Sequence, residues 1–280
     1  MFHLPHPLIP IRQRLTVRPG VFALLAALVV ALAIGGCGLL PEVEDKTANL
    51  SAERLYKLAH EALVEGNYTQ AIKHFDTLEA RYPYGRYAQQ AILESAYANY
   101  RAGESATAVA ACDRFIRTFP NHPNVDYAHY LKGLVNFRED LGLLGYVYEL
   151  DLSEREPKGM RESFAAFKEL VTKFPESRYA QDATERMKYL TNALGRYEVN
   201  VARYYFNRGA YVAAINRAQA ALVGYPRTPA NEGALDVLIQ SYGKLGLTQL
   251  RDDSQRILQR TFPNSIYVAG PAAKPWWKFW

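Results

Sequence analysis

Apolar residues recur with the period of an α-helix along most of the chain. One helical face is marked by residues three and four positions apart, namely Leu55, Leu58, Ala59, Ala62 and Leu63. Gly66-Asn67 interrupts this pattern. A second apolar face follows before Pro83 and contains Ala71, Ile72, Phe75 and Leu78. The pattern therefore predicts two consecutive helices, which small Ala59 and Ala71 allow to approach each other.

The ending of this helix pair recurs along the chain. An aromatic residue followed by proline occurs at Pro83, Pro120, Pro175, Pro226 and Pro263, with spacings of 37, 55, 51 and 37 residues. Such self-similarity resembles the tetratricopeptide repeat (TPR), whose period is about 34 residues. We therefore expect an all-α fold, a tetratricopeptide-like helical solenoid of about five helix pairs over residues 51–263, with an extended concave surface.

Two units depart from the regular length. In the third unit, the first helix, near 127–138, is separated from the second, near 157–173, by an insertion loop near 139–156. The fourth unit has a long first helix, near 179–207. A basic and aromatic tail over 264–280 ends in Lys274-Pro275-Trp276-Trp277-Lys278-Phe279-Trp280. The tail could dock in a groove, rest at a membrane interface or form a disordered end.

The first 36 residues have the pattern of a secretory signal. Arg12, Arg14 and Arg18 precede an apolar run from Val21 to Ile34. The run is shorter than the roughly 20 residues that span a bilayer as a helix. We expect residues 1–36 to be a cleaved signal peptide.

Cys37 is the predicted lipid attachment site. Ile34-Gly35-Gly36-Cys37 resembles the bacterial lipobox, in which the cysteine receives a diacylglycerol and becomes the acylated amino terminus. Residues 37–50 would then form the lipidated cysteine and a polar tether. The resemblance favours the periplasmic face of the outer membrane, because Gly38 replaces the aspartate of inner-membrane retention signals. A plain cleaved signal beside an uninvolved cysteine is the alternative.

Charge and cysteine content exclude several classes of protein. The net charge is +5, but without the leader the chain has 30 basic and 28 acidic residues, so nucleic-acid binding is not expected. Two cysteines, Cys37 and Cys112, are too few for a disulfide framework in a chain of 280 residues. Cys112 lies within a helical pattern, where a buried thiol is expected.

The sequence lacks catalytic motifs and a convincing metal site. The spacings H-E-x-x-H, G-x-S-x-G and G-x-x-x-x-G-K are absent, and the repeats leave no room for a catalytic domain, so we expect no enzyme activity and no cofactor. His60 and His74 lie on the two helices of one unit and could approach each other. No third ligand is suggested, so we expect them to be histidines on helix surfaces.

Several loop and helix phrases narrow the resemblance beyond the repeat. They are Arg81 to Tyr87, Phe115-Ile116-Arg117, His122 to Tyr127, Asp151 to Pro157, Tyr197-Glu198, Val201-Ala202, Tyr204-Tyr205, Arg208-Gly209-Ala210 and Asn216-Arg217. Together with the lipobox, this ordered set resembles the BamD family of outer-membrane protein assembly factors, from Cys37 to about Pro263. The resemblance implies a scaffold that binds the barrel protein BamA, other Bam lipoproteins and unfolded barrel proteins.

The resemblance also implies a division of labour between the two ends of the solenoid. In the first three units, the expected substrate-binding residues are Tyr56, His60, Gln90, Tyr97, Tyr100 and Tyr130, although these rings could instead fill the core between repeats. In the fourth unit, Arg203, Arg208 and Arg217 are the expected partner-binding residues, with Arg217 the strongest candidate for a BamA contact. Arg217 could instead be an ordinary surface arginine.

Two other functional classes remain open from the sequence. A TPR lipoprotein that serves secretin assembly or cell-envelope constriction would share the leader and the repeats. Such a protein would not be expected to carry the His122 to Tyr127 phrase or the Asp151 to Pro157 loop. A hydrolase fused to repeats would need the catalytic motifs that are missing.

Overall fold

A computed structural model describes residues 47–139 and 156–268. Every helix described below belongs to one unit of the chain, which begins at Leu50. The leader, Cys37, most of the tether, residues 140–155 of the insertion and residues 269–280 of the tail lie outside the described residues.

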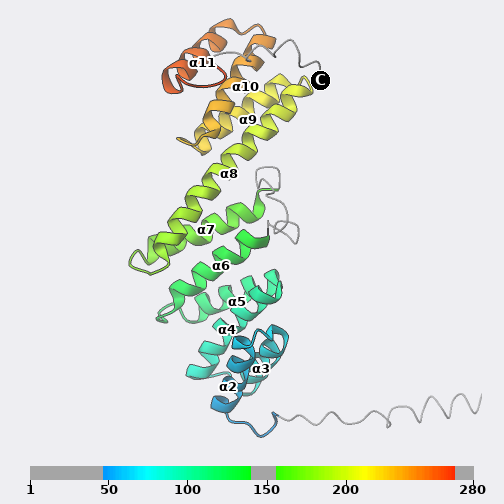
Figure 1. Ribbon diagram of the computed structural model, residues 1–280, viewed down its shortest axis with the longest axis vertical. Helices are drawn as coiled ribbons and strands as arrows, with labels where there is room; N and C mark the ends of the chain where they lie inside the picture. The colour runs from blue at the N-terminus through cyan, green and yellow to red at the C-terminus, as the bar shows by residue number, and fades with distance from the viewer. Residues whose placement is uncertain (1–46, 140–155, 269–280) are drawn as a thin grey trace, which may run out of the picture. The chain divides into compact units, whose positions relative to one another are not determined.

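The described residues form ten α-helices and no strands, which confirms the predicted all-α helical solenoid. The helices are α2 (Ala52–Val64), α3 (Tyr68–Arg81), α4 (Arg86–Ala102), α5 (Ser105–Thr118), α6 (Val125–Glu139), α7 (Lys158–Lys173), α8 (Ala180–Asn207), α9 (Tyr211–Gly224), α10 (Ala230–Lys244) and α11 (Thr248–Thr261). Consecutive helices pair as α2–α3, α4–α5, α6–α7, α8–α9 and α10–α11, and each pair packs on the next (Figure 1).

Each second helix ends in the same way, two residues before a proline. The residue after the last helical position is aromatic in every pair, namely Tyr82, Phe119, Phe174, Tyr225 and Phe262. Its N–H still donates to the carbonyl four residues earlier, while its own backbone has left the helical region. Proline disfavours a helical conformation in the residue before it, so the recurrent aromatic-proline phrase sets the length of each pair.

Glycines with positive φ connect the two helices of four pairs. They are Gly66, Gly103, Gly209 and Gly246, with φ between +71° and +87°. A side chain at these positions would be strained in the left-handed region, and glycine avoids that cost. Asn67 then begins α3, because its side chain accepts a hydrogen bond from the N–H of Gln70.

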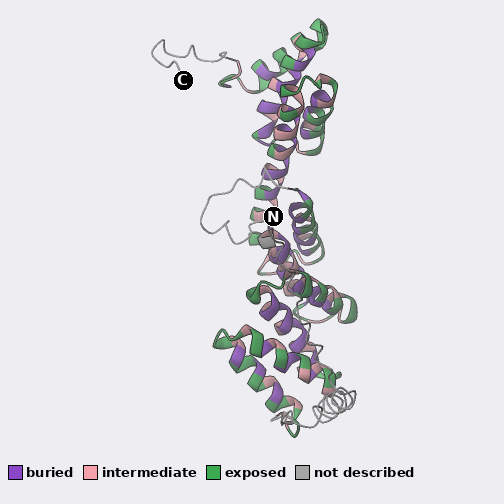
Figure 2. Cartoon of the chain, turned by 90° about the vertical axis from the view of Figure 1, so that its right-hand side faces the viewer, coloured by how far each residue is buried: buried purple, intermediate pink, exposed green. Residues whose placement is uncertain are grey.

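Small and large apolar residues alternate through the core. In the first pair, Ala59 and Ala71 are fully buried in one core cluster with the ring of Phe75. Phe115 and Phe167 have equivalent roles in the second and third pairs. Figure 2 shows the buried stripe along each helix and the exposed outer surface. Within the described ranges, no helix is both long and apolar enough to cross a membrane.

Helices α6 and α7 approach each other closely at Gly133. The buried hydroxyl of Ser163 donates to the carbonyl of Gly133 at 2.8 Å. One turn further along α7, the fully buried ring of Phe167 covers the Gly133 Cα, and an added Cβ would lie 2.4 Å from that ring. Because α6 also carries Tyr127 and Tyr130, this contact positions part of the site described next.

Candidate binding site on the first helices of the repeats

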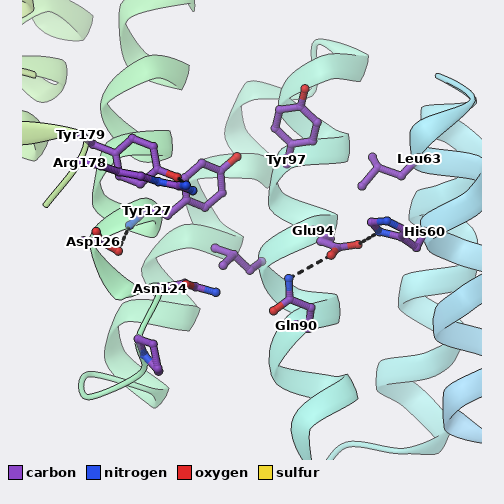
Figure 3. A pocket seen from close by; sticks show the side chains of 12 residues that line it. His60, Leu63, Gln90, Glu94, Tyr97, Asn124, Asp126, Tyr127, Arg178 and Tyr179 are labelled. Atoms are coloured by element: carbon purple, nitrogen blue, oxygen red, sulfur yellow. Dashed lines mark hydrogen bonds and ion pairs between the residues drawn. The ribbon is translucent and has the colours of Figure 1, made fainter. Parts of the chain in front are cut away.

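A cavity of about 590 Å³ opens between the first helices of the first three pairs (Figure 3). His60 and Leu63 come from α2, whereas Gln90, Leu93, Glu94 and Tyr97 come from α4. The opposite wall consists of Pro123, Asn124, Asp126 and Tyr127 at the start of α6, with Arg178 and Tyr179 just before α8. We call this cavity the first-helix pocket. It combines aromatic and aliphatic surface with amide and charged groups on separate repeats.

Glu94 organises the polar side of the first-helix pocket. Its carboxylate accepts hydrogen bonds from the Tyr56 hydroxyl at 2.6 Å and from Gln90 Nε2 at 3.0 Å, and contacts His60 Nδ1 at 2.8 Å. Burial, together with the hydrogen bond to Glu94, raises the pKa of Tyr56, so its hydroxyl stays protonated and donates. The network fixes side chains from α2 and α4 in one arrangement.

Tyrosine rings form the opposite side of the site. Tyr179 lies 5.4 Å from the ring of Tyr127 and stacks on Tyr130 at 4.6 Å between centroids. The Tyr130 hydroxyl donates to Asp182 Oδ2 at 2.7 Å. Burial and that hydrogen bond raise the pKa of Tyr130. Tyr127 and Tyr179 therefore present a fixed aromatic wall to the pocket, with Tyr130 stacked on Tyr179, and this wall suits apolar or aromatic side chains of a ligand.

The structure separates the six expected substrate-binding residues into two groups. His60, Gln90 and Tyr97 line the first-helix pocket, whereas Tyr56, Tyr100 and Tyr130 are not among its lining residues. Tyr56 supports the site through Glu94, and Tyr130 supports it through Tyr179. Tyr100 packs against the cluster that contains Ala108 and Cys112. All three rings are partly buried and pack against core clusters of the helix pairs.

The three expected partner-binding arginines lie apart in different surroundings. Arg203 donates to the Tyr267 hydroxyl at 2.5 Å, and Gly233 makes room for its guanidinium on α10. Arg208 is exposed and lies over the ring of Tyr204. Arg217 Nη1 donates to Glu198 Oε2 at 3.1 Å and lines a separate cavity of about 550 Å³.

Sequence reasoning gave no role to two carboxylates that organise these surfaces. Glu94 was not singled out, although its four-residue spacing from Gln90 places both on one face of α4. Glu198 is part of the Tyr197-Glu198 pair that carries the family resemblance, but its contact with Arg217 was not predicted. One signal was present, because Leu190, Leu194, Glu198 and Ala202 share one face of α8, where an acid interrupts an apolar stripe.

His60 and His74 contact different partners. His60 contacts Glu94, whereas His74 Nε2 lies 2.7 Å from the amide nitrogen of Gln70. The expectation of a surface histidine is wrong for His74, which is buried; burial lowers its pKa, as does the neighbouring Lys73. No group of three or more histidine, cysteine or acidic residues that could hold a metal occurs in the described part of the chain.

Paired helices that repeat along the chain, with an open pocket of mixed aromatic and polar lining across three repeats, place the chain in the class of helical-repeat proteins. Residues 48–257 match the model of the family described as YfiO, outer membrane lipoprotein. The chain is 44% identical to an outer membrane protein assembly factor BamD of Neisseria meningitidis serogroup A, over 92% of this chain and 98% of the relative. Proteins of the same name from Xylella fastidiosa strain Temecula1 and Vibrio cholerae serotype O1 are 38% and 33% identical, over 94% and 84% of this chain and 89% and 96% of the relatives.

The chain therefore belongs to the BamD (YfiO) family of outer membrane lipoproteins. The resemblance noted from the loop phrases is confirmed by this membership. The relatives are named as assembly factors and not as enzymes, which agrees with the expectation from the missing catalytic motifs.

Proposed function

We propose that the chain is a lipid-anchored periplasmic scaffold of the outer-membrane β-barrel assembly machinery. It binds a BamA-like barrel protein, other Bam lipoproteins and unfolded barrel proteins, and assists their insertion into the outer membrane. Membership in a family whose relatives are outer membrane protein assembly factors supports this role. The observation that carries the proposal furthest is the first-helix pocket, since its mixed aromatic and polar lining comes from three repeats and matches the length and chemistry of an extended peptide.

The first-helix pocket receives segments of unfolded barrel proteins. An extended segment advances about 3.3 Å per residue and presents alternate side chains to one face. Tyr97 and Tyr127 supply aromatic surface for those side chains, while Gln90 and Asn124 supply amide groups for the backbone. The pocket is open to solvent, which suits entry of a long chain and rapid release. Tyr56, Tyr100 and Tyr130 act here by supporting the residues that contact the segment.

The fourth pair contacts the BamA-like protein. Arg217 is the central residue of this contact, because its guanidinium is half-exposed at a cavity while Glu198 holds one of its nitrogens. Arg208 is exposed and adds charge to the same pair of helices. Arg203 contributes through the segment after α11, which it binds at Tyr267.

Cys37 attaches the scaffold to the periplasmic face of the outer membrane. The lipobox resemblance supports acylation of this cysteine, and several acyl chains on one residue give stable anchoring. Residues 37–50 then act as the tether between the lipid and α2. The covalent lipid is the only non-protein group required; no metal, cofactor or nucleic acid takes part.

Depletion of the chain from a two-membrane bacterium tests the proposed function. We expect a general fall in the amount of folded barrel proteins in the outer membrane, as measured by heat-modifiable mobility of several unrelated barrels. Restoring the full-length chain from a plasmid should restore them all. Loss of a single secretin complex or a division defect with normal barrels would reject the proposal in favour of another TPR lipoprotein.

A further inference from the structure

Glu198 is a buried acid between two arginines of neighbouring helices. It is the only acidic residue among the buried side chains of the described ranges, and its carboxylate is 6% exposed. Oε1 lies 3.5 Å from Arg161 Nη2 of α7, and Oε2 lies 3.1 Å from Arg217 Nη1 of α9. Since Glu198 itself lies on α8, one carboxylate joins three consecutive helices.

The two arginines have one side toward Glu198 and the other toward solvent. Their side chains are 55% and 46% exposed, and both line the cavity of about 550 Å³ that Arg217 faces. We call this cavity the arginine cavity; its other lining residues are Glu156, Pro157, Lys158, Glu162 and Tyr197. A guanidinium is a planar fork with five N–H donors, so one contact with Glu198 leaves donors that can point into the cavity.

A buried carboxylate between these arginines fixes their direction. Taking an ion out of water is costly unless partners compensate it, so Glu198 favours the arrangement in which both guanidinium groups remain close to it. Without that negative charge, the two cations on α7 and α9 would lose the anion that lies between them, and each long side chain could turn away into solvent. The geometry thus makes the direction of Arg161 and Arg217 dependent on Glu198.

We infer that Glu198 is a positioning residue that holds Arg161 and Arg217 as a paired receptor for an acidic side chain of the BamA-like partner. This inference rests on the proposed function, in which Arg217 is the partner contact, and it adds Arg161 as a second contact. The guanidinium pair matches a carboxylate in charge and in hydrogen-bond geometry. The positive charges of Lys158, Arg161 and Arg217 are balanced by the negative charges of Glu156, Glu162 and the buried Glu198. Recognition of the acidic side chain therefore occurs at short range and not by long-range attraction.

The test measures the dissociation constant between the full-length chain and the detergent-solubilised BamA-like protein of the same bacterium. Four variants are compared with the wild type: Arg217→Gln, Arg161→Gln, Glu198→Gln and the double variant Glu198→Gln/Arg217→Gln. We expect Arg217→Gln to weaken the association about tenfold, and Arg161→Gln and Glu198→Gln to weaken it several-fold. Since Glu198 acts through both arginines, the double variant should weaken binding by less than the product of the two single effects, because only Arg161 is left for Glu198 to position.

A control in the same helix separates positioning from loss of structure. Leu190→Val removes one buried methylene group from α8 and touches no charge. It should lower the thermal unfolding midpoint but leave the dissociation constant unchanged. Arg217→Lys keeps the positive charge but lacks the planar guanidinium. Its dissociation constant should therefore lie between those of the wild type and Arg217→Gln.

The outcomes distinguish the inference from the function on which it rests. If Arg217→Gln binds as tightly as the wild type, the proposed contact at the fourth pair fails. If Arg217→Gln weakens binding and Glu198→Gln does not, only the positioning role is overturned. The positioning role is also overturned if Glu198→Gln weakens binding by the same factor with and without Arg217, or if Leu190→Val weakens it equally.

Discussion

Replacing Gly133 by valine is expected to destabilise the solenoid at its third pair. A Cβ at this position would lie 2.4 Å from the ring of Phe167, which is fully buried and also packs against Tyr130. Ring and helix must therefore move apart, and the Ser163 hydrogen bond to the Gly133 carbonyl would be strained as well. Overpacking of a core costs about 1–3 kcal/mol, and a valine here should reach the upper end. Urea unfolding followed by circular dichroism measures the change.

Two further variants define how much of this effect comes from crowding. Gly133→Ala adds only the Cβ and gains up to about 1 kcal/mol of helix propensity. Its free energy of unfolding should therefore lie between those of the wild type and the valine variant. Gly224→Ala is the matched control, because a Cβ at the end of α9 meets nothing within 4 Å. Gly224→Ala should leave the free energy of unfolding unchanged or raise it slightly. If the midpoint of urea unfolding of Gly133→Val equals that of the wild type, this result contradicts the close α6–α7 contact.

Replacing Cys37 by serine is expected to abolish lipid attachment, and with it the anchoring of the mature chain. Thioether formation requires a thiol nucleophile, and a serine hydroxyl at neutral pH is far less nucleophilic than a thiolate. The chain should remain an unprocessed precursor or enter the soluble periplasmic fraction. The measurement is the share of the chain that stays with the membranes after cells are fractionated and the membranes are washed at high salt and alkaline pH. The loss of anchored mature chain should be nearly complete, because several acyl chains are removed together.

Cys112 provides the control for this substitution. It is fully buried in the second pair, and burial raises the pKa of its thiol to about 12, so it is protonated and inert at neutral pH. Cys112→Ala should leave membrane attachment unchanged. If Cys37→Ser is processed to the mature length and still stays in the washed membrane fraction as fully as the wild type, the anchor lies elsewhere and the tether assignment for residues 37–50 fails with it.

The regular part of the fold could be predicted from the sequence because local rules determine it. The aromatic-proline phrase ends every second helix, and glycine at Gly66, Gly103, Gly209 and Gly246 provides the left-handed turn between paired helices. Neither rule needs information from distant residues. The long first helix of the fourth unit, observed as Ala180–Asn207, was likewise visible as an unbroken helical pattern.

The candidate sites were predictable only in part, because they depend on contacts between distant residues. Tyr56 and Glu94 are 38 positions apart, and Glu198 and Arg217 are 19 apart. Helical periodicity gives the face of each residue but not the direction of a long side chain once it has left the helix. For this reason, the sequence identified Tyr97 and Arg217 as surface candidates but missed the carboxylates that fix their surroundings.

The most direct test of the account is photocrosslinking from the first-helix pocket during the synthesis of barrel proteins. A photoreactive phenylalanine analogue replaces Tyr97, which lines the pocket on α4. The same analogue replaces Thr107 in a matched control, because Thr107 is exposed on α5 of the same repeat and is not part of the pocket lining. Both variants keep the leader and Cys37.

We expect unfolded barrel proteins to be captured from position 97 and not from position 107. The crosslinks should disappear when synthesis of new barrel proteins is blocked, since folded barrels no longer present extended segments. Capture of equal amounts from both positions, or from position 107 alone, would contradict a scaffold that receives its substrates in the first-helix pocket.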